Sequence, residues 1–202
     1  MTSQTFRFSE RKAIALPNVR KVAQSATFSL TIKHNVLVFC LLMMTTVSVF
    51  AQQPSMQALI GQSLSKLQQP TPEAFLNCVA EMKRIDAMFP DSIQPKYQMA
   101  LQSLYFSVMN PHAEQTERLL AEAGQTITQM ETMKNADQSD LCTLRGFLYM
   151  VRIVQDPAQN GQRYYIDVMQ NFEKALKLNP DNQLASQLQE KFFEGMQQAT
   201  GQ

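Results

Sequence analysis

"NFEKALKLNPDN", Asn171–Asn182, combines an apolar helical stripe with a proline that ends it. The stripe starts upstream, and its apolar residues follow the spacing i, i+3, i+4, i+7, i+11: Tyr165, Val168, Met169, Phe172 and Leu176. This spacing predicts an amphipathic helix, and Pro180 predicts where it stops. A single helix before a proline is common, so the fold depends on whether the stretch recurs.

The stretch does recur, 90 residues earlier (172 − 82), in "CVAEMKRIDAMFPDS". Relative positions 0, 3 and 8 hold an apolar residue, a second apolar residue and a proline in both windows: Met82, Ile85 and Pro90, then Phe172, Ala175 and Pro180. Four residues before each anchor lie Cys78 and Val168, whose fairly small side chains let two helices approach closely. Such self-similarity predicts a helical repeat.

The two windows resemble the second-helix signature of the tetratricopeptide repeat (TPR), a helix–turn–helix unit of 34 residues. Gly146 and Tyr149 in "GFLY" also look like the Gly-x-x-Tyr part of its first-helix signature. The layout is similar to small secreted TPR-like proteins of Gram-negative envelopes, in which an irregular repeat pair follows a signal peptide. The resemblance implies an all-α fold, a TPR-like stack of antiparallel helical hairpins with degenerate repeats.

Turn residues divide the chain into about seven helices, and no segment alternates apolar and polar residues as a strand would. The expected helices are Ser55–Gln68, Pro72–Met88, Ile93–Met109, Pro111–Lys134 after an Asn110 cap, Leu141–Gln155, a sixth through Tyr165–Leu176, and Gln183–Gln198. The third and fifth are apolar nearly all round, which predicts burial inside a layer. The fourth has a thin apolar face, which predicts an outward position.

The pattern of the first 51 residues predicts a secretory signal peptide, although the segment is long for one. A basic flank precedes the uncharged, apolar run Val36–Phe50, and the exit at Ala51 predicts cleavage between Ala51 and Gln52. The apolar run is short for a bilayer span of about 20 residues, so an uncleaved membrane anchor is the alternative. The prediction is an exported protein of the periplasm or cell surface, with residues 52–202 as one domain.

The sequence of the mature part, residues 52–202, indicates neither an enzyme nor a nucleic-acid-binding protein. Its formal charge is 12 − 16 = −4, without a basic run to hold phosphates. It carries one histidine, His112, and no metal, nucleotide or nucleophile motif, so no metal or cofactor is expected. Cys78 and Cys142 each lie in an apolar helical pattern, which favours buried thiols over a disulfide.

The most unusual segment is an insertion of about ten residues relative to a regular repeat, in "VRIVQDPAQNGQR" and the two tyrosines after it. One interpretation is a recognition loop, since arginine and tyrosine dominate interface energies. The other, which we favour, is that Asp156 caps the next helix or pairs with Arg163 while the tyrosines pack onto the preceding helix. The candidate interaction residues are Tyr105, Arg152, Asp156, Arg163 and Tyr164.

The fold resemblance implies a scaffold for protein–protein interaction in the cell envelope, with an unidentified protein partner. Membrane contact is expected only through an uncleaved signal segment. Two alternatives remain. One is a small-ligand module with a pocket lined by Tyr97, Tyr105 and Tyr149, and the other is a structural subunit that self-associates as a homo-oligomer.

Overall fold

The computed structural model describes residues 54–200, which belong to one compact unit. The predicted signal peptide and its cleavage site at Ala51 and Gln52 lie outside the described residues. The described part is all-α, as predicted, and has no strand. Its elements are α2 (Met56–Ser65), the short 3-10 helix η1 (Lys66–Gln68), α3 (Pro72–Met88), α4 (Ile93–Met109), α5 (Thr116–Glu131), α6 (Gln138–Gln155), α7 (Pro157–Leu178) and α8 (Gln183–Thr200).

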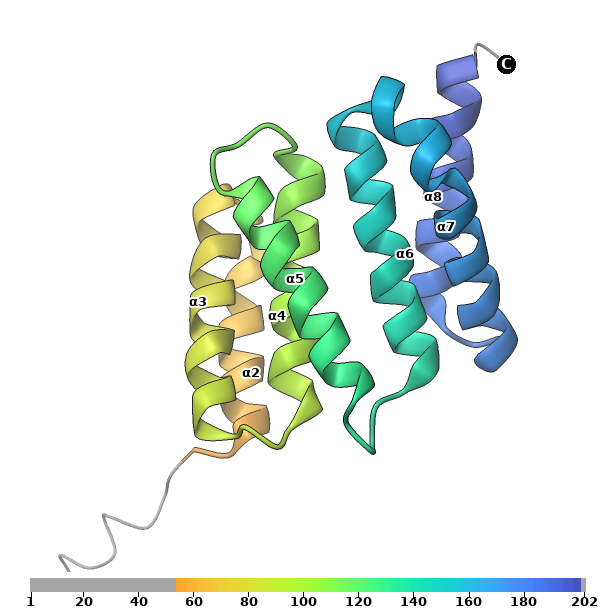
Figure 1. Ribbon diagram of the computed structural model, residues 1–202. Helices are drawn as coiled ribbons and strands as arrows, with labels where there is room; N and C mark the ends of the chain where they lie inside the picture. Colours follow the sequence, from red (N-terminus) through yellow and green to blue (C-terminus); the bar gives the residue numbers. More distant parts are fainter. Residues whose placement is uncertain (1–53, 201–202) are drawn as a thin grey trace, which may run out of the picture. The chain divides into compact units, whose positions relative to one another are not determined.

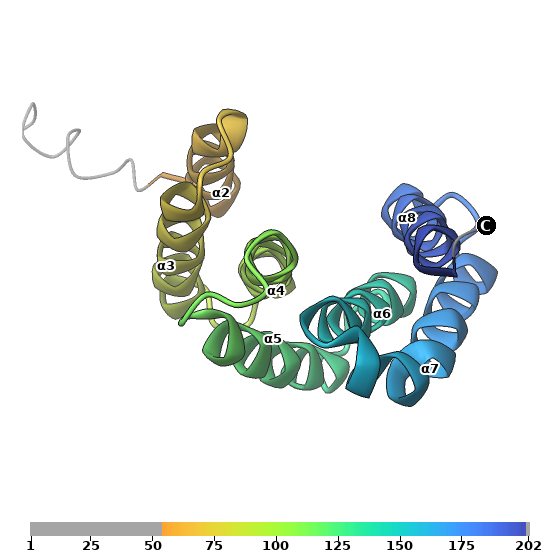
Figure 2. The same cartoon turned by 90° about the horizontal axis from the view of Figure 1, so that it is seen from above.

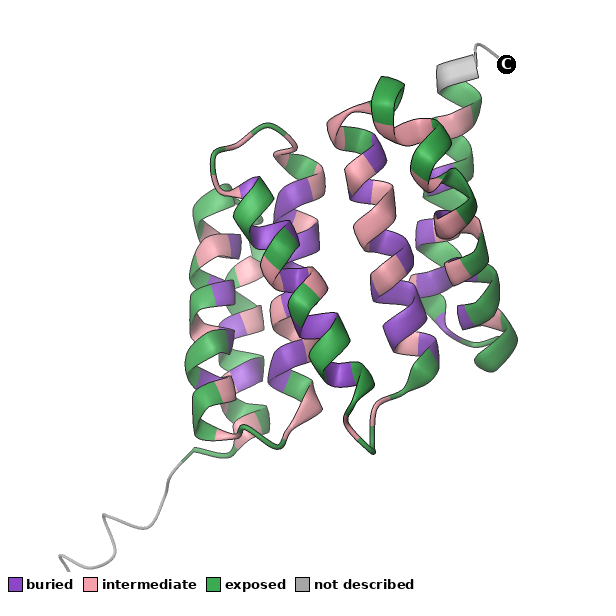
Figure 3. Cartoon of the chain, viewed as in Figure 1, coloured by how far each residue is buried: buried purple, intermediate pink, exposed green. Residues whose placement is uncertain are grey.

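Consecutive helices run antiparallel and stack into an arc of two layers (Figures 1 and 2). Seen from above, α3, α5 and α7 form the outer layer, and α2, α4, α6 and α8 lie on the inner side. Burial follows this layering (Figure 3): α4 and α6 are buried on several sides, whereas α5 keeps an exposed outer face. The predictions of two buried helices and an outward-facing one between them are confirmed.

Local signals set the ends of α3 and α4, whose bounds agree with the prediction. The Thr71 hydroxyl accepts a hydrogen bond from the Ala74 amide at 3.2 Å, and Pro72 occupies the first turn, where its missing N–H costs nothing. Phe89 caps the C-terminus of α3, and Pro90 follows in the turn. A proline beyond the C-cap cannot continue a helix, so the chain reverses into α4.

The predicted start of the fourth helix at Pro111 was wrong, because α5 begins at Thr116. Asn110 instead closes α4: its side-chain amide donates to the Phe106 carbonyl at 3.0 Å, and its own carbonyl accepts from the Thr116 hydroxyl at 2.5 Å. His112 therefore lies in a turn rather than in a helix.

The start of one further helix lies upstream of its predicted position. Helix α6 begins at Gln138, because the Asp137 carboxylate accepts from the Ser139 amide at 2.8 Å and from the Asp140 amide at 3.1 Å. Helix α7 begins at Pro157, with Asp156 as its cap, as the favoured interpretation of the insertion expects. Apart from Asp156, the segment between Tyr149 and Val168 is helical, so it does not form the loop of the other interpretation.

The two recurring windows bury the same positions. Cys78, Met82 and Ile85 on α3, like Val168, Phe172 and Ala175 on α7, are at most 5 % exposed, and Pro90 and Pro180 lie in the turns that follow. Both cysteines are free and buried, as predicted, and burial raises the pKa of each thiol. The Cys78 sulfur accepts a hydrogen bond from the Ser63 hydroxyl at 3.4 Å, which joins α3 to α2.

Asn182 ties α8 to α6 through a buried polar network. Its side-chain oxygen accepts from the Ala185 amide at 3.0 Å and so caps α8. Its amide nitrogen lies 2.8 Å from the Ser139 hydroxyl, 3.2 Å from the Thr143 hydroxyl and 3.3 Å from the Asp140 carboxylate. Ser139 in turn donates to the Ala175 carbonyl, which brings α7 into the same network.

Replacing Asn182 with alanine is expected to lower the free energy of unfolding by about 2 kcal/mol, since it removes a helix cap and the amide group that donates to the buried Ser139 and Thr143 hydroxyl oxygens. Urea unfolding measures the change. Asn179→Ala is the matched control: Asn179 caps only the exposed amide of Asp181, so a loss below about 0.5 kcal/mol is expected there. Equal losses for both variants would contradict the role of the buried network.

Candidate functional site

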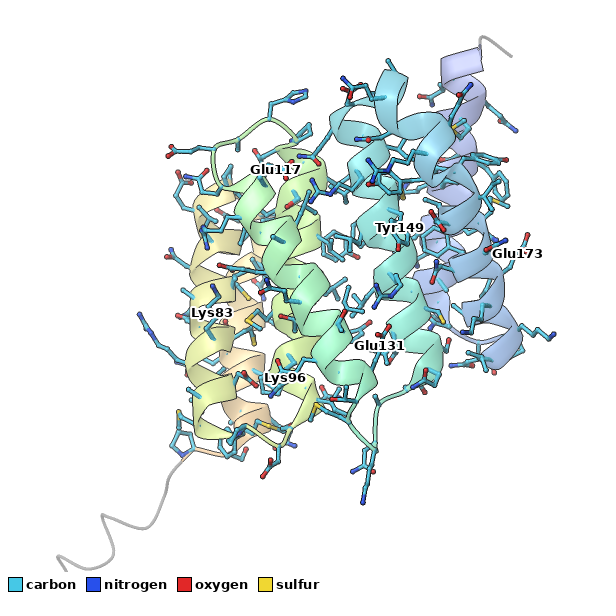
Figure 4. All side chains as sticks on the ribbon, viewed as in Figure 1. Lys83, Lys96, Glu117, Glu131, Tyr149 and Glu173 are labelled. Atoms are coloured by element: carbon cyan, nitrogen blue, oxygen red, sulfur yellow. The ribbon has the colours of Figure 1, made fainter. Side chains whose placement is uncertain are left out.

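Arg152, one of the predicted interaction residues, joins α6 to α5. Its guanidinium donates to both oxygens of the Glu117 carboxylate, at 2.7 and 2.8 Å, and Gln155 donates to the same group at 2.8 Å. The Arg152 hydrogen bonds hold the pKa of Glu117 below its usual range. Figure 4 places Glu117 at the N-terminal end of α5. The polar atoms of this group are therefore already engaged within the fold.

Tyr164 and Arg163 lie on α7, and Tyr164 packs back onto α6. The Tyr164 ring stacks on Tyr149, with centroids 5.3 Å apart and planes 19° apart, and the Arg163 guanidinium lies 5.0 Å from the Tyr164 centroid. Asp156 caps α7 by accepting from the Gln159 amide at 3.0 Å. Arg163 forms no ion pair with Asp156 in the described part of the chain. The side chains around the insertion therefore pack at the connection between α6 and α7.

Tyr105 lies apart from these residues, in the aromatic core. Its ring meets Phe147 of α6 edge-on at a centroid distance of 5.3 Å, and Phe75 of α3 at 6.5 Å. Burial raises the pKa of its phenol. The structure therefore brings Arg152, Asp156, Arg163 and Tyr164 to the α6–α7 connection and places Tyr105 elsewhere.

An open pocket of about 520 Å³ lies where the N-terminal ends of α4 and α6 meet, toward the lower edge in Figure 1. Both helices belong to the inner layer (Figure 2). The lining is acidic, amide-rich and partly aromatic: Asp91, Ser92, Ile93, Gln94, Tyr97, Gln98, Asn135, Asp137, Asp140 and Leu141. Of the described residues that line it, none is Lys, Arg or His. Of the three tyrosines predicted to line a ligand pocket, only Tyr97 does so here.

Within residues 54–200, the pocket carboxylates lack cationic partners. Asp91, Asp137 and Asp140 take part in none of the six ion pairs of the described residues. Burial, and after it the nearby charge of Asp137, raises the pKa of Asp140. Burial, with Asp140 next in importance, raises the pKa of Tyr97 well above its usual value. Burial is the larger cause of both pKa shifts, and the neighbouring carboxylates add to it because like charges disfavour the ionised form.

Sequence reasoning missed this pocket. Asp137 and Asp140 fall in "NADQSD", between the predicted fourth and fifth helices, and Asp91 follows the proline of the first repeat window. Two of them have a local role: Asp137 caps α6, and Asp140 lies in its first turn, where the helix dipole favours negative charge. Local signals therefore explain these two carboxylates singly, and only the stacking of α4 beside α6 brings them together with Asp91.

Among residues 54–200, no group of three or more His, Cys, Asp or Glu side chains is arranged to hold a metal ion. Within the same part of the chain, no helix is long and apolar enough to cross a membrane. No known protein family, curated protein or solved structure matches the chain.

Proposed function

We propose that this protein is a TPR-like scaffold of the cell envelope that binds a segment of a partner protein at the inner-layer pocket between α4 and α6. The observation that carries the proposal is the pocket itself, an opening of about 520 Å³ whose carboxylates have no cationic partner in the described structure. The two windows with matching buried positions support the TPR-like assignment. The signal-like sequence before Ala51 supports export.

The chemistry of the pocket favours a basic segment as its occupant. A lysine or arginine side chain that enters between Asp91 and Asp140 would meet uncompensated negative charge, and the Tyr97 ring offers a face for a cation–π contact. The side-chain amides in the lining can accept or donate hydrogen bonds from the partner's backbone. Charge complementarity of this kind raises association rates and selects among partners.

Removing two pocket charges is expected to abolish capture of the partner. We expect Asp137→Asn/Asp140→Asn to weaken binding by about tenfold or more. Asparagine caps a helix as well as aspartate does, so α6 should keep its start. The matched control is Glu173→Gln/Glu190→Gln, which removes two exposed carboxylates outside the pocket lining. Circular dichroism would check that all the variants remain folded.

The measurement is affinity capture from the cell envelope followed by mass spectrometry, run in parallel with the wild type and both double variants. The partner should be a protein retained by the wild type and the control but lost by the pocket variant. Its binding should weaken as salt rises, since exposed charges are screened. Recovery of the same proteins by all three would contradict the pocket as the binding site.

Binding to the pocket is also expected to weaken in acid. Because the folded-state pKa of Asp140 is raised, its carboxyl takes up a proton at a higher pH than an ordinary aspartate. The attraction for a cation is thus present above that pKa and lost as the pH falls through it. Titrating the partner's affinity against pH, with Asp140→Asn beside the wild type, isolates this contribution. The variant should lack the wild type's first loss on acidification.

A further inference from the structure

The hairpin α2–α3 forms one edge of the described stack and carries an open groove of about 270 Å³. The lining side chains follow the spacing i, i+3, i+4, i+7, from Leu59 on α2 to its C-cap Lys66, and from Glu81 to Met88 on α3. This spacing places each set on a single helix face, over about two turns. The groove is therefore a regular, two-helix surface.

The groove is mainly apolar at one end. Ile85 is 5 % exposed, Leu59 is half-buried, and Met88 is 54 % exposed, which is high for a large apolar side chain. Helix α2 packs against α3 and η1, whereas each of α4 and α6 packs against helices on both sides along the stack. Stacked helical hairpins need their outermost apolar faces covered to remain soluble. The Met88 end of the groove is such a face.

The other end of the groove is charged, with both signs present. Lys66 and Glu81 form an ion pair at 2.5 Å. Arg84, one turn after Glu81 on α3, is exposed and takes part in none of the ion pairs of the described residues. An exposed base therefore lies beside an acid on the same helix face. In a two-fold interface, residue i meets residue j and residue j meets residue i, so this pattern is complementary to itself.

We propose that a second copy of this chain docks on the α2–α3 groove, forming a two-fold dimer in which Arg84 of each copy faces Glu81 of the other. A carboxylate can accept several hydrogen bonds, so Glu81 can keep Lys66 while it gains the second copy's guanidinium. The flexible Met88 side chains fill the apolar ends of the facing grooves. This surface is separate from the α4–α6 pocket, so either interaction can fail without the other.

The test is sedimentation velocity on the protein purified from cells that express the complete chain. The wild type should dimerise, and Arg84→Glu or Glu81→Lys alone should weaken the dimer by about tenfold or more, because each places like charges opposite one another. Mixing the two variants in equal amounts should restore a dimer made of one copy of each, since both contacts then join opposite charges. Ile166→Glu is the matched control: Ile166 is 62 % exposed on α7 and outside the groove, and this variant should dimerise as the wild type does.

Three results would overturn the proposal. The first is a wild type that stays monomeric up to about 100 µM, a concentration at which even a weak dimer forms. The second is a dimer that withstands both charge reversals, which would assign it to another surface. The third is a mixture of variants that fails to pair while both remain folded by circular dichroism. If the groove instead holds a different protein, the purified wild type alone will be monomeric, which is the first of these results.

Discussion

Replacing Gly146 with leucine is expected to lower the free energy of unfolding by about 3 kcal/mol. A Cβ atom at this position would lie 2.9 Å from Cε1 of Phe172 and 3.3 Å from Cβ of Asn171. Phe172 is fully buried, so its ring has no free space into which to turn. The extra side chain must therefore push α6 away from α7, and the core that both helices share would lose contact.

The matched control is Gly161→Ala on α7. No atom lies within 4 Å of a Cβ placed at Gly161, so alanine there should stabilise the helix by about 0.5–1 kcal/mol through its better helix propensity. Urea unfolding, followed by circular dichroism, should move the two midpoints in opposite directions. If Gly146→Leu unfolded at the wild-type midpoint, the close approach of α6 and α7 would be refuted.

Gly146 and Phe172 also illustrate what the sequence can predict. Both were named in the sequence as positions of the two TPR-like helix signatures, and the structure packs the Phe172 ring against Gly146. The ends of α3 and α4 were likewise predictable, because a cap and a proline act within a few residues of their own position. For α3 and α4 the local signals predict both ends to the residue.

Two similar dipeptides, Asn110-Pro111 and Asp156-Pro157, have different outcomes. The favoured interpretation expected each to start a helix, with Asn110 or Asp156 as its cap, and only the second does so. Asn110 turns its amide back to the last turn of α4, whereas Asp156 accepts from an amide ahead of it and starts α7. Whether a helix starts depends on whether the side chain forms its hydrogen bond with the preceding or the following backbone. The dipeptide alone does not specify that direction.

The candidate pocket could not be predicted for a different reason. Asp91 and Asp140 are 49 residues apart (140 − 91), and no pattern in the sequence relates them. Their proximity follows from the packing of α4 against α6, two helices that are not consecutive in the chain. By contrast, the arginines and tyrosines of the insertion were conspicuous in the sequence as candidate interaction residues. In the structure their side chains contact one another and the adjacent helices.

Lys96 provides the second large expected effect, since its ammonium group is buried at the turn between α3 and α4. The side chain is 2 % exposed, and its Nζ donates to the Asp86 carboxylate at 2.5 Å and to the Pro90 carbonyl at 2.6 Å (Figure 4). Asp86 is the only carboxylate paired with it among the described residues. A buried charge that loses its counterion is strongly destabilising, whereas removing both charges costs much less.

Asp86→Ala is therefore expected to lower the free energy of unfolding by about 3 kcal/mol, while Lys96→Met should cost less than about 1 kcal/mol, since the thioether fills similar volume without a charge. The double variant should recover most of the loss, and urea unfolding of all four proteins closes the double-mutant cycle. Lys83→Ala breaks an exposed pair with Glu122 and, as the control, should change stability by less than about 1 kcal/mol. A double variant no more stable than Asp86→Ala would mean that the carboxylate acts through something other than the charge of Lys96.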